Sequence, residues 1–336
     1  CQRRAAVAMG MASLSPLSRQ GMDRAMKDKL VTVFGGAGFV GRQVVQSLLA
    51  QGARVRVAQR SLTTAMRVKP LGGLGQTQLV AADVTNPASV ALAITGSDVV
   101  INLVGVLTGD FDAVQAKGAA HVAQAAAQAG VGALVHVSAI GADPESPSAY
   151  GRSKAAGEAA VLAAFPTATI IRPSIIFGSE DQFTNRFAGL IRSMPVVPVI
   201  GAATKFQPVY VADVAHAIVA AAGAPAAHGG RTFELGGPQT MTMLAINEWI
   251  AARIGRERSF VPVPAPVASL IAAFGFLPGA PITRDQWAML QKDNVAAAGA
   301  PGLAELGVTA TPMAAVADAW LVVYRKHGRF AGRVSA

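Results

Sequence analysis

The chain has 336 residues, of which 52% are hydrophobic and 14% are charged, and its formal net charge is +10. Its one cysteine, Cys1, excludes an internal disulfide and a cysteine-based metal site, and we expect no metal site of any kind. The basic residues are scattered, without a run or an interleaved aromatic set. Nucleic-acid binding is therefore not expected, whereas peripheral attraction to an anionic membrane surface is compatible with the charge.

Residues 1–29 are expected to be a leader or a mis-assigned start that is disordered and outside the fold. They are rich in Ala, Arg, Ser and Met and show no hydrophobic periodicity. An arginine- and serine-containing, acid-poor leader resembles an organelle transit peptide. An over-extended start in an alanine-rich genome produces the same pattern, and we prefer that interpretation.

The first predicted element is a strand over 31–34, which leads into a glycine-rich turn and a helix that ends near Ala50. The turn has the G-x-x-G-x-x-G spacing of a dinucleotide fingerprint in its expected strand–turn–helix setting. One glycine permits the tight turn, another lets the backbone approach a pyrophosphate, and the last lets the helix pack on the sheet. The helix N-terminus offers free N–H groups to the phosphates. The residues expected to contact the pyrophosphate are Gly35, Gly38, Phe39, Val40 and Gly41.

Strands and helices alternate along the next part of the chain. Further strands are predicted over 54–60, 78–83, 98–104, 133–138, 168–173 and 231–235, with helices over 112–130, 148–164 and 209–222. Near-continuous apolar strands that alternate with helices predict an α/β fold with a doubly wound parallel sheet of the Rossmann type. We expect the dinucleotide-binding domain to comprise 30–178 and 204–236. A smaller C-terminal lobe for a substrate or partner would comprise 179–203 and 237–336.

One apolar stretch in the predicted lobe, Phe260–Ile282, contains no charged residue but is interrupted by prolines. Its unbroken middle is too short to span a membrane. A buried helix, a partner contact and an interfacial helix are all compatible with it.

The end of the second predicted strand bears on the choice of cofactor. Sites that prefer NAD carry an acid there that bonds the ribose 2′-hydroxyl, whereas this strand ends in Gln59-Arg60-Ser61. Arg60 and Ser61 suit a 2′-phosphate through charge and hydrogen bonding, and Arg42 is a second candidate. NADP(H) is therefore the preferred cofactor, with NAD(H) as the alternative. The later strand ends are expected to contact the adenine through Asp83 and Val84 and the middle of the cofactor through Asn102, Val104 and Gly105.

A second constellation comprises Ser138, Tyr150 and Lys154. The i, i+4 spacing places Tyr150 and Lys154 on one face of the helix predicted after the fifth strand. A nearby ammonium would lower the pKa of the tyrosine hydroxyl, which could then act as a general acid or base, and a serine hydroxyl could hold a carbonyl. The same Tyr150 and Lys154 could bind the nicotinamide ribose without chemistry. Pro173, at the end of the sixth strand, is expected near the nicotinamide.

Together these features resemble the extended or atypical branch of the short-chain dehydrogenase/reductase superfamily over about residues 30–330. Several segments resemble one of its families, the NADPH-binding accessory subunit of respiratory complex I (NADH:ubiquinone oxidoreductase) and its bacterial relatives. These segments are 99–105, 136–139, 150–158, 165–178, 180–183, 207–213, 283–287 and 293–295. The resemblance implies a tightly held, structural NADPH and complex I subunits as partners. It also implies the bacterial cytoplasm or the cytoplasmic face of the inner membrane, or the matrix side in a eukaryote.

An active enzyme is the alternative: an NADPH-dependent reductase, or an enzyme like the sugar-nucleotide epimerases and dehydratases, with Tyr150 as general acid/base. In the resemblance to extended enzymes, Gln115 stands where an asparagine usually anchors the proton relay, which puts efficient proton transfer in doubt. The segment 283–295 matches the complex I family, and we expect no role for it in chemistry.

Overall fold

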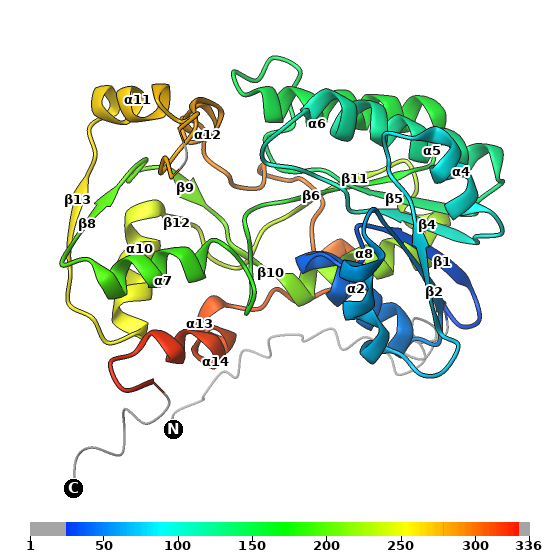
Figure 1. Cartoon of the computed structure of the whole chain (residues 1–336), viewed down its shortest axis with the longest axis horizontal. Helices are drawn as coiled ribbons and strands as arrows, with labels where there is room; N and C mark the ends of the chain where they lie inside the picture. Colours follow the sequence, from blue (N-terminus) through cyan, green and yellow to red (C-terminus); the bar gives the residue numbers. More distant parts are fainter. Residues whose placement is uncertain (1–24, 278, 329–336) are drawn as a thin grey trace, which may run out of the picture.

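The computed structural model describes residues 25–277 and 279–328. Its centre is a sheet of seven parallel strands in the order β11-β6-β5-β4-β1-β2-β3, seen on the right of Figure 1. The strands are β1 (Leu30–Phe34), β2 (Arg54–Gln59), β3 (Thr77–Ala81), β4 (Val99–Asn102), β5 (Ala133–Val137), β6 (Thr169–Pro173) and β11 (Thr232–Leu235). Each lies within a sequence range predicted to be a strand or overlaps one closely, so the doubly wound parallel sheet is confirmed.

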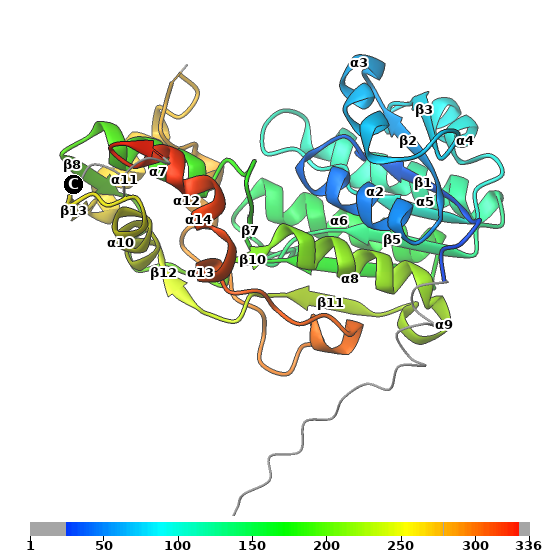
Figure 2. The ribbon, with the colours of Figure 1, turned by 90° about the horizontal axis from the view of Figure 1, so that it is seen from below.

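Helices cover both faces of this sheet. One face carries α2 (Phe39–Ala50) and α8 (Val211–Gly223), which lie side by side in Figure 2, together with α3 (Leu62–Ala65) and the 3-10 turn Met66–Leu71. The other face carries α4 (Pro87–Ile94), α5 (Gly118–Gln128) and α6 (Ala149–Ala164). The short helix α9 (Pro225–His228) follows α8. The predicted helix over 112–130 differs in its first part, because Asp112–Lys117 is π-helical and continues into α5.

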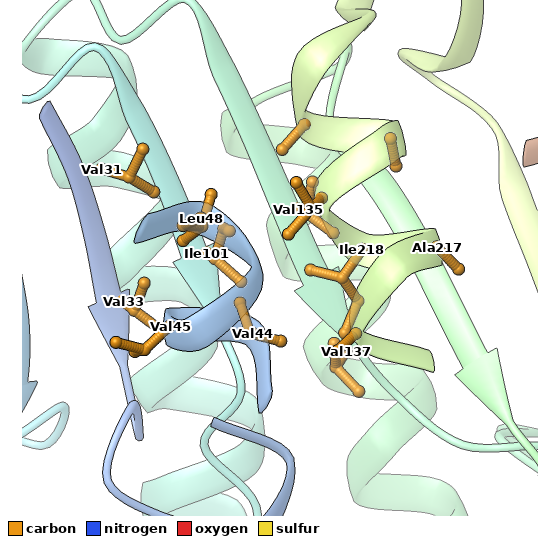
Figure 3. Close-up of a cluster of buried hydrophobic side chains, with 14 of the residues drawn as sticks. Val31, Val33, Val44, Val45, Leu48, Ile101, Val135, Val137, Ala217 and Ile218 are labelled. Carbon is orange, nitrogen blue, oxygen red and sulfur yellow. The ribbon is translucent and has the colours of Figure 1, made fainter. Parts of the chain in front are cut away.

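The core follows from the two-residue alternation of the strands. Val31 and Val33 point to one face, where they meet Val44, Val45 and Leu48 of α2 (Figure 3). Phe34 points to the opposite face, among residues of α4 and α5. Buried apolar side chains on both faces explain why the strands read as nearly continuous apolar runs.

The remaining elements form a smaller group, on the left of Figure 1, that we call the C-terminal lobe. Its helices are α7 (Thr184–Ser193), α10 (Met243–Arg253), α11 (Ala265–Ala273), α12 (Arg284–Met289), α13 (Met313–Val316) and α14 (Asp318–Leu321), with a 3-10 turn at Val322–Tyr324. Its strands β8 (Val196–Val199), β9 (Lys205–Phe206), β12 (Met241–Thr242) and β13 (Ser259–Pro262) pair as β13-β8 and β12-β9. The pair β10 (Val209–Tyr210) and β7 (Ile176–Phe177) joins the lobe to the sheet. The lobe has its own apolar cluster around Ile191, Val197, Ile246 and Ile250.

Part of the predicted lobe packs on the sheet instead. The 3-10 turn Ala304–Leu306 contributes Leu306 to the core beside α8, and Leu303 is buried there too. The backbone carbonyl of Pro301 accepts a hydrogen bond from Glu234 on the edge strand β11. This contact pairs backbone groups of the edge strand that would otherwise face solvent. It gives a physical reason why the segment around 301–306 packs against the sheet.

The predicted leader needs a correction at its end. Residues 1–24 lie outside the described residues, but Met26 is fully buried in the core beside α2 and α8. The backbone N–H of Asp28 donates to the carbonyl of Gly52, and Lys29 accepts from Arg54. Residues 25–29 therefore belong to the folded structure, because Met26 is buried in the core and backbone groups of Asp28 and Lys29 are hydrogen-bonded to the sheet domain.

No helix among the described residues is both long and apolar enough to cross a membrane.

Gly157 allows α6 to lie very close to the π-helical segment. A Cβ atom at Gly157 would come within 2.3 Å of the carbonyl oxygen of Gln115, whereas a Cβ at Gly189, in α7, would meet no atom within 4 Å. We expect Gly157→Ala to lower the free energy of unfolding by about 1–3 kcal/mol through overpacking. The matched control Gly189→Ala should be neutral or stabilising by up to about 1 kcal/mol. Urea unfolding compares the two, and equal effects would contradict the close approach.

Candidate functional site

The strand order reverses between β1 and β4, and the candidate site lies at the carboxyl ends of these two strands. Ligands of open parallel sheets bind at such a switch point. Gly35 follows β1 with φ +77°, and a Cβ there would lie 3.4 Å from the backbone carbon of Leu103, which follows β4. The loops after β1 and β4 therefore touch at the point where a dinucleotide is expected.

The glycine-rich turn has the shape that a pyrophosphate requires. A Cβ at Gly41 would lie 2.3 Å from the carbonyl oxygen of Gly35, so only glycine permits the helix to begin this close to the turn. Gly38 is exposed and caps α2 without a side-chain hydrogen bond. Phe39, Val40 and Gly41 occupy the first turn of α2, where helix N–H groups have no intrahelical partner. The turn thus fits the phosphates of a dinucleotide, held by these N–H groups.

The end of β2 presents one free cationic side chain. Arg60 is exposed, and no hydrogen bond or ion pair involves it among residues 25–277 and 279–328. Ser61 has another task, because its side chain caps α3 by accepting a hydrogen bond from the Thr64 N–H at 3.4 Å. Arg42 does not face this end of the site: it forms an ion pair with Glu180. Within the described residues, Arg60 is therefore unengaged at this end of the site, whereas Arg42 is paired with Glu180.

The residues expected at the adenine end are held by local bonds. Asp83 accepts hydrogen bonds from the backbone N–H and the hydroxyl of Thr85, which lower the pKa of its carboxyl, and the charge of Arg60 lowers it further. Asp83 and Arg60 are thus electrostatic neighbours across the ends of β3 and β2. Val84 is buried, and its side chain would lie 2.8 Å from a Cβ at Gly118. Its role in the described residues is packing between β3 and α5.

Asn102 ends β4 with its side chain inside the protein. Its Oδ1 accepts a hydrogen bond from the Val104 N–H at 3.1 Å, and its Nδ2 lies 3.2 Å from Nδ1 of the buried His136. Nδ1 therefore accepts, and the ring proton of His136 is on Nε2, which has no partner among the described residues. Burial lowers the pKa of His136 to about 3, and the charge of Lys154 contributes. His136 is therefore a neutral histidine of the core.

Ser138, Tyr150 and Lys154 lie at the same edge of the sheet. Ser138 follows β5, and its buried hydroxyl has no partner within the described residues. Lys154 is buried in α6, where its Nζ donates to the Val137 carbonyl at 3.2 Å and lies 5.9 Å from the ring centroid of Tyr150. Pro173 is buried at the end of β6 and accepts a hydrogen bond from the N–H of Ile140. The structure thus brings these groups together around the end of β5.

The pKa of Tyr150 is shifted opposite to the expectation from its lysine neighbour. Burial raises the pKa of Tyr150 to about 12, and burial lowers the pKa of Lys154 to about 8, an effect that Glu158 partly opposes. Loss of hydration penalises the charged form of each group. The expected lowering of the tyrosine pKa is wrong for this structure, because desolvation by burial raises it instead.

Gln115 is buried beside the same lysine. Its Nε2 donates to Ser153 Oγ at 2.9 Å, and its Oε1 is 3.4 Å from the backbone N of Val106. A Cβ at Gly105 would lie 3.1 Å from Lys154 Nζ and 3.4 Å from Gln115 Oε1. The Gln115 amide therefore joins the loop after β4 to α6. Gln115 itself lies in the π-helical segment Asp112–Lys117, where the sequence predicted the first part of an α-helix. Single-turn π-helical segments are frequent at functional sites.

Two residues at this edge were missed by the sequence analysis. Asp285 of α12 accepts hydrogen bonds from the first residues of α6, and Asn294 accepts from Ser174 and Ile175 after β6. The Thr283–Gln286 capping box predicts a helix start near Asp285. No local pattern indicates a contact with a helix 136 residues earlier, because only the tertiary fold brings the two together.

A Rossmann sheet with a glycine-rich turn at its switch point and a Ser–Tyr–Lys set on the same edge defines a nicotinamide dinucleotide-binding protein of the short-chain dehydrogenase/reductase class. The chain belongs to the NAD dependent epimerase/dehydratase family, which it matches over residues 31–236.

Its relatives include subunits of mitochondrial NADH dehydrogenases. The chain is 39% identical over 295 residues to NADH dehydrogenase (ubiquinone) 1 alpha subcomplex subunit 9 of Mus musculus. This alignment covers 84% of this chain and 77% of the relative. It is 33% identical to the NADH-ubiquinone oxidoreductase 40 kDa subunit of Neurospora crassa, over 76% of this chain and 68% of the relative. An NADPH-dependent quinone oxidoreductase from Escherichia coli, solved with NADPH, has the same fold, with a TM-score of 0.70 and 17% identity over 87% of this chain and 99% of that one.

The neutral state of His136 predicts a pH dependence of stability. Its folded pKa of about 3 lies below the ordinary value of 6.5, so between these values the unfolded chain binds a proton that the native chain excludes. Stability should therefore fall as the pH falls through this range, by up to about 1.4 kcal/mol per pH unit from this group. We expect His136→Gln to flatten the slope of unfolding free energy between pH 6 and pH 4.

The control is His216→Gln, since His216 is exposed on α8. It should retain the wild-type slope. A His136→Gln chain that also retains the full slope would refute the assignment of a buried neutral histidine.

Proposed function

We propose that this chain is an accessory subunit of a respiratory complex I that holds NADP(H) as a structural cofactor. The similarity to the mouse subunit carries the proposal. It spans 295 residues and therefore extends well beyond the matched family region, residues 31–236, into the C-terminal lobe. The partners would be subunits of the complex, on the cytoplasmic face of a bacterial membrane or the matrix side in a mitochondrion.

The chemistry of the site supports binding more than turnover. Burial raises the pKa of Tyr150, which disfavours a tyrosinate near neutral pH. The amide of Gln115 is engaged with Ser153 and Val106, so it is committed to holding the loop after β4. These residues can bind and orient a nicotinamide ribose without passing a proton.

One observation favours the alternative of an active NADPH-dependent reductase. The Ser138 hydroxyl, in the Ser–Tyr–Lys set, is buried and has no partner among the described residues. A buried hydroxyl without a hydrogen bond costs free energy, and a carboxamide or a substrate carbonyl would satisfy it. The two functions therefore differ in whether Tyr150 must transfer a proton.

We further propose NADP(H) over NAD(H). The end of β2 has no carboxylate, and Arg60 is an exposed cation beside Asp83 at the strand ends. Arginine binds phosphate through charge-assisted hydrogen bonds. These features support a site for the 2′-phosphate.

Replacing Arg60 tests this preference. We expect Arg60→Ala to weaken NADPH binding by about 1.5–3 kcal/mol, the value of a hydrogen bond to a charged group, and to leave NADH binding nearly unchanged. Arg54→Ala is the matched control, because Arg54 is an exposed arginine at the opposite end of the same strand. Titration of each protein with both nucleotides measures the difference. Equal losses for NADPH and NADH would show that Arg60 does not select the phosphate.

The exposed apolar face of the lobe offers a test of the accessory role. Leu270, in α11, is 62% exposed, and Phe276, just after α11, is 78% exposed; α11 itself lies at the upper left of Figure 1. Large exposed apolar side chains gathered in one segment are typical of a protein interface. We expect Phe276→Glu to reduce the fraction of the chain that co-migrates with complex I on native gels at least about tenfold. The variant should still bind NADPH.

Two further variants complete the comparison. Leu74→Glu places the same charge at an exposed leucine in the loop before β3, remote from the lobe, and should leave co-migration intact. Tyr150→Phe should retain co-migration, because it removes only a hydroxyl, and this hydroxyl lies at the nucleotide edge rather than in the lobe. A true acid–base role would instead cost about two to four orders of magnitude in turnover. An intact chain that never migrates with the complex would defeat the accessory role.

A further inference from the structure

Helix α6, which carries Tyr150 and Lys154, is anchored by a carboxylate of the C-terminal lobe. Asp285, in α12, accepts a hydrogen bond at 2.6 Å from the backbone N–H of Ala149 and another at 3.3 Å from that of Tyr150. It also accepts one at 2.9 Å from the hydroxyl of Ser148. These three residues are the N-cap and the first two residues of α6.

The anchor satisfies the part of α6 that most needs a partner. The first N–H groups of a helix have no intrahelical acceptor, and the helix dipole favours a negative charge there. Ser148 by itself satisfies only one of them, because its hydroxyl accepts from the N–H of Gly151 at 3.3 Å. Asp285 supplies the acceptors for Ala149 and Tyr150 and orients the hydroxyl of Ser148. The backbone of Tyr150 is thus fixed by a residue of the C-terminal lobe.

The segment around Asp285 is itself firmly held against the sheet. Thr283 and Gln286 form a reciprocal capping box that fixes the first turn of α12. Farther along, Asn294 Oδ1 accepts hydrogen bonds from Ser174 Oγ at 2.7 Å and from the Ile175 N–H at 2.9 Å, just after β6. The segment 283–294 therefore contacts both α6 and the end of β6, so it can pass a change in the lobe to the nucleotide edge.

We propose that Asp285 is a positioning residue for Tyr150, and that it couples the C-terminal lobe to the nicotinamide half of the nucleotide site. This inference rests on the proposed binding of NADP(H) at that site. Coupling between two sites is reciprocal. A nicotinamide nucleotide that contacts Tyr150 and Lys154 stabilises the docked position of α12, and a partner that holds the lobe in that position strengthens nucleotide binding.

The test compares two ligands that share the adenine half of the site. NADPH reaches from the glycine turn to Tyr150, whereas adenosine 2′,5′-bisphosphate has no nicotinamide half and ends before α6. In the full chain, we expect Asp285→Ala to weaken NADPH about tenfold and to leave adenosine 2′,5′-bisphosphate within about twofold. A general loss of stability would weaken both ligands alike. Asp285→Asn keeps one acceptor oxygen, so it should restore part of the NADPH affinity, and it serves if the alanine variant fails to fold.

Asp293→Ala is the matched control. Asp293 lies in the same segment and accepts a hydrogen bond from the Lys205 N–H at 2.8 Å, within the lobe alone. It should change neither ligand. The proposed coupling is wrong if the two Asp285 variants lose affinity for both ligands equally, or for neither. In those cases the proposed nucleotide site still stands. If the wild-type chain binds neither ligand, the proposed NADP(H) site itself fails.

Discussion

The parallel pairing of β4 with β1 is the constraint on which the rest of the site depends. It places Phe34 opposite Asn102, so both strands end at one level of the sheet. Because all seven strands run in the same direction, every loop that follows a strand emerges at that same edge. The glycine turn after β1, Arg60 after β2, Asp83 after β3, Asn102 in β4, Ser138 after β5 and Pro173 in β6 are brought together by this geometry. No single local motif could assemble them.

Desolvation governs the chemistry at this edge more than proximity does. Lys154 and His136 are buried and Tyr150 is partly buried, and the pKa of each shifts toward its neutral form. Lys154 nonetheless donates to the Val137 carbonyl, which gives its ammonium a place in the core. A bound dinucleotide would alter this balance by adding polar groups next to Ser138 and Tyr150. In the proposed function, these groups hold the ribose and the carboxamide of the nucleotide.

The C-terminal lobe and the sheet are joined by polar contacts that converge on the nucleotide edge. Arg42 of α2 pairs with Glu180, which precedes α7. On the other side, Arg172 of β6 is held by Glu158 of α6 and by Glu234 of β11, and Glu234 also accepts from the N–H of Ala297. Glu158 is buried, and an unpaired buried charge is costly, so its pairing with Arg172 is favoured.

Sequence by itself determined the strand–helix alternation, the glycine turn and the set of strand-end residues, because these depend on local periodicity and on residue types with one dominant use. The buried sheet strands, α6 with its Tyr150–Lys154 spacing and the switch-point turn were all predictable for this reason. Tertiary structure alone decided the direction of the pKa shifts, since desolvation depends on what covers Tyr150 and Lys154. It also decided that Met26 lies in the core, that Arg42 pairs with Glu180, and that Asp285 caps a helix 136 residues away. Contacts between residues so distant in sequence leave no periodic signal, because they depend on how separately formed elements pack together.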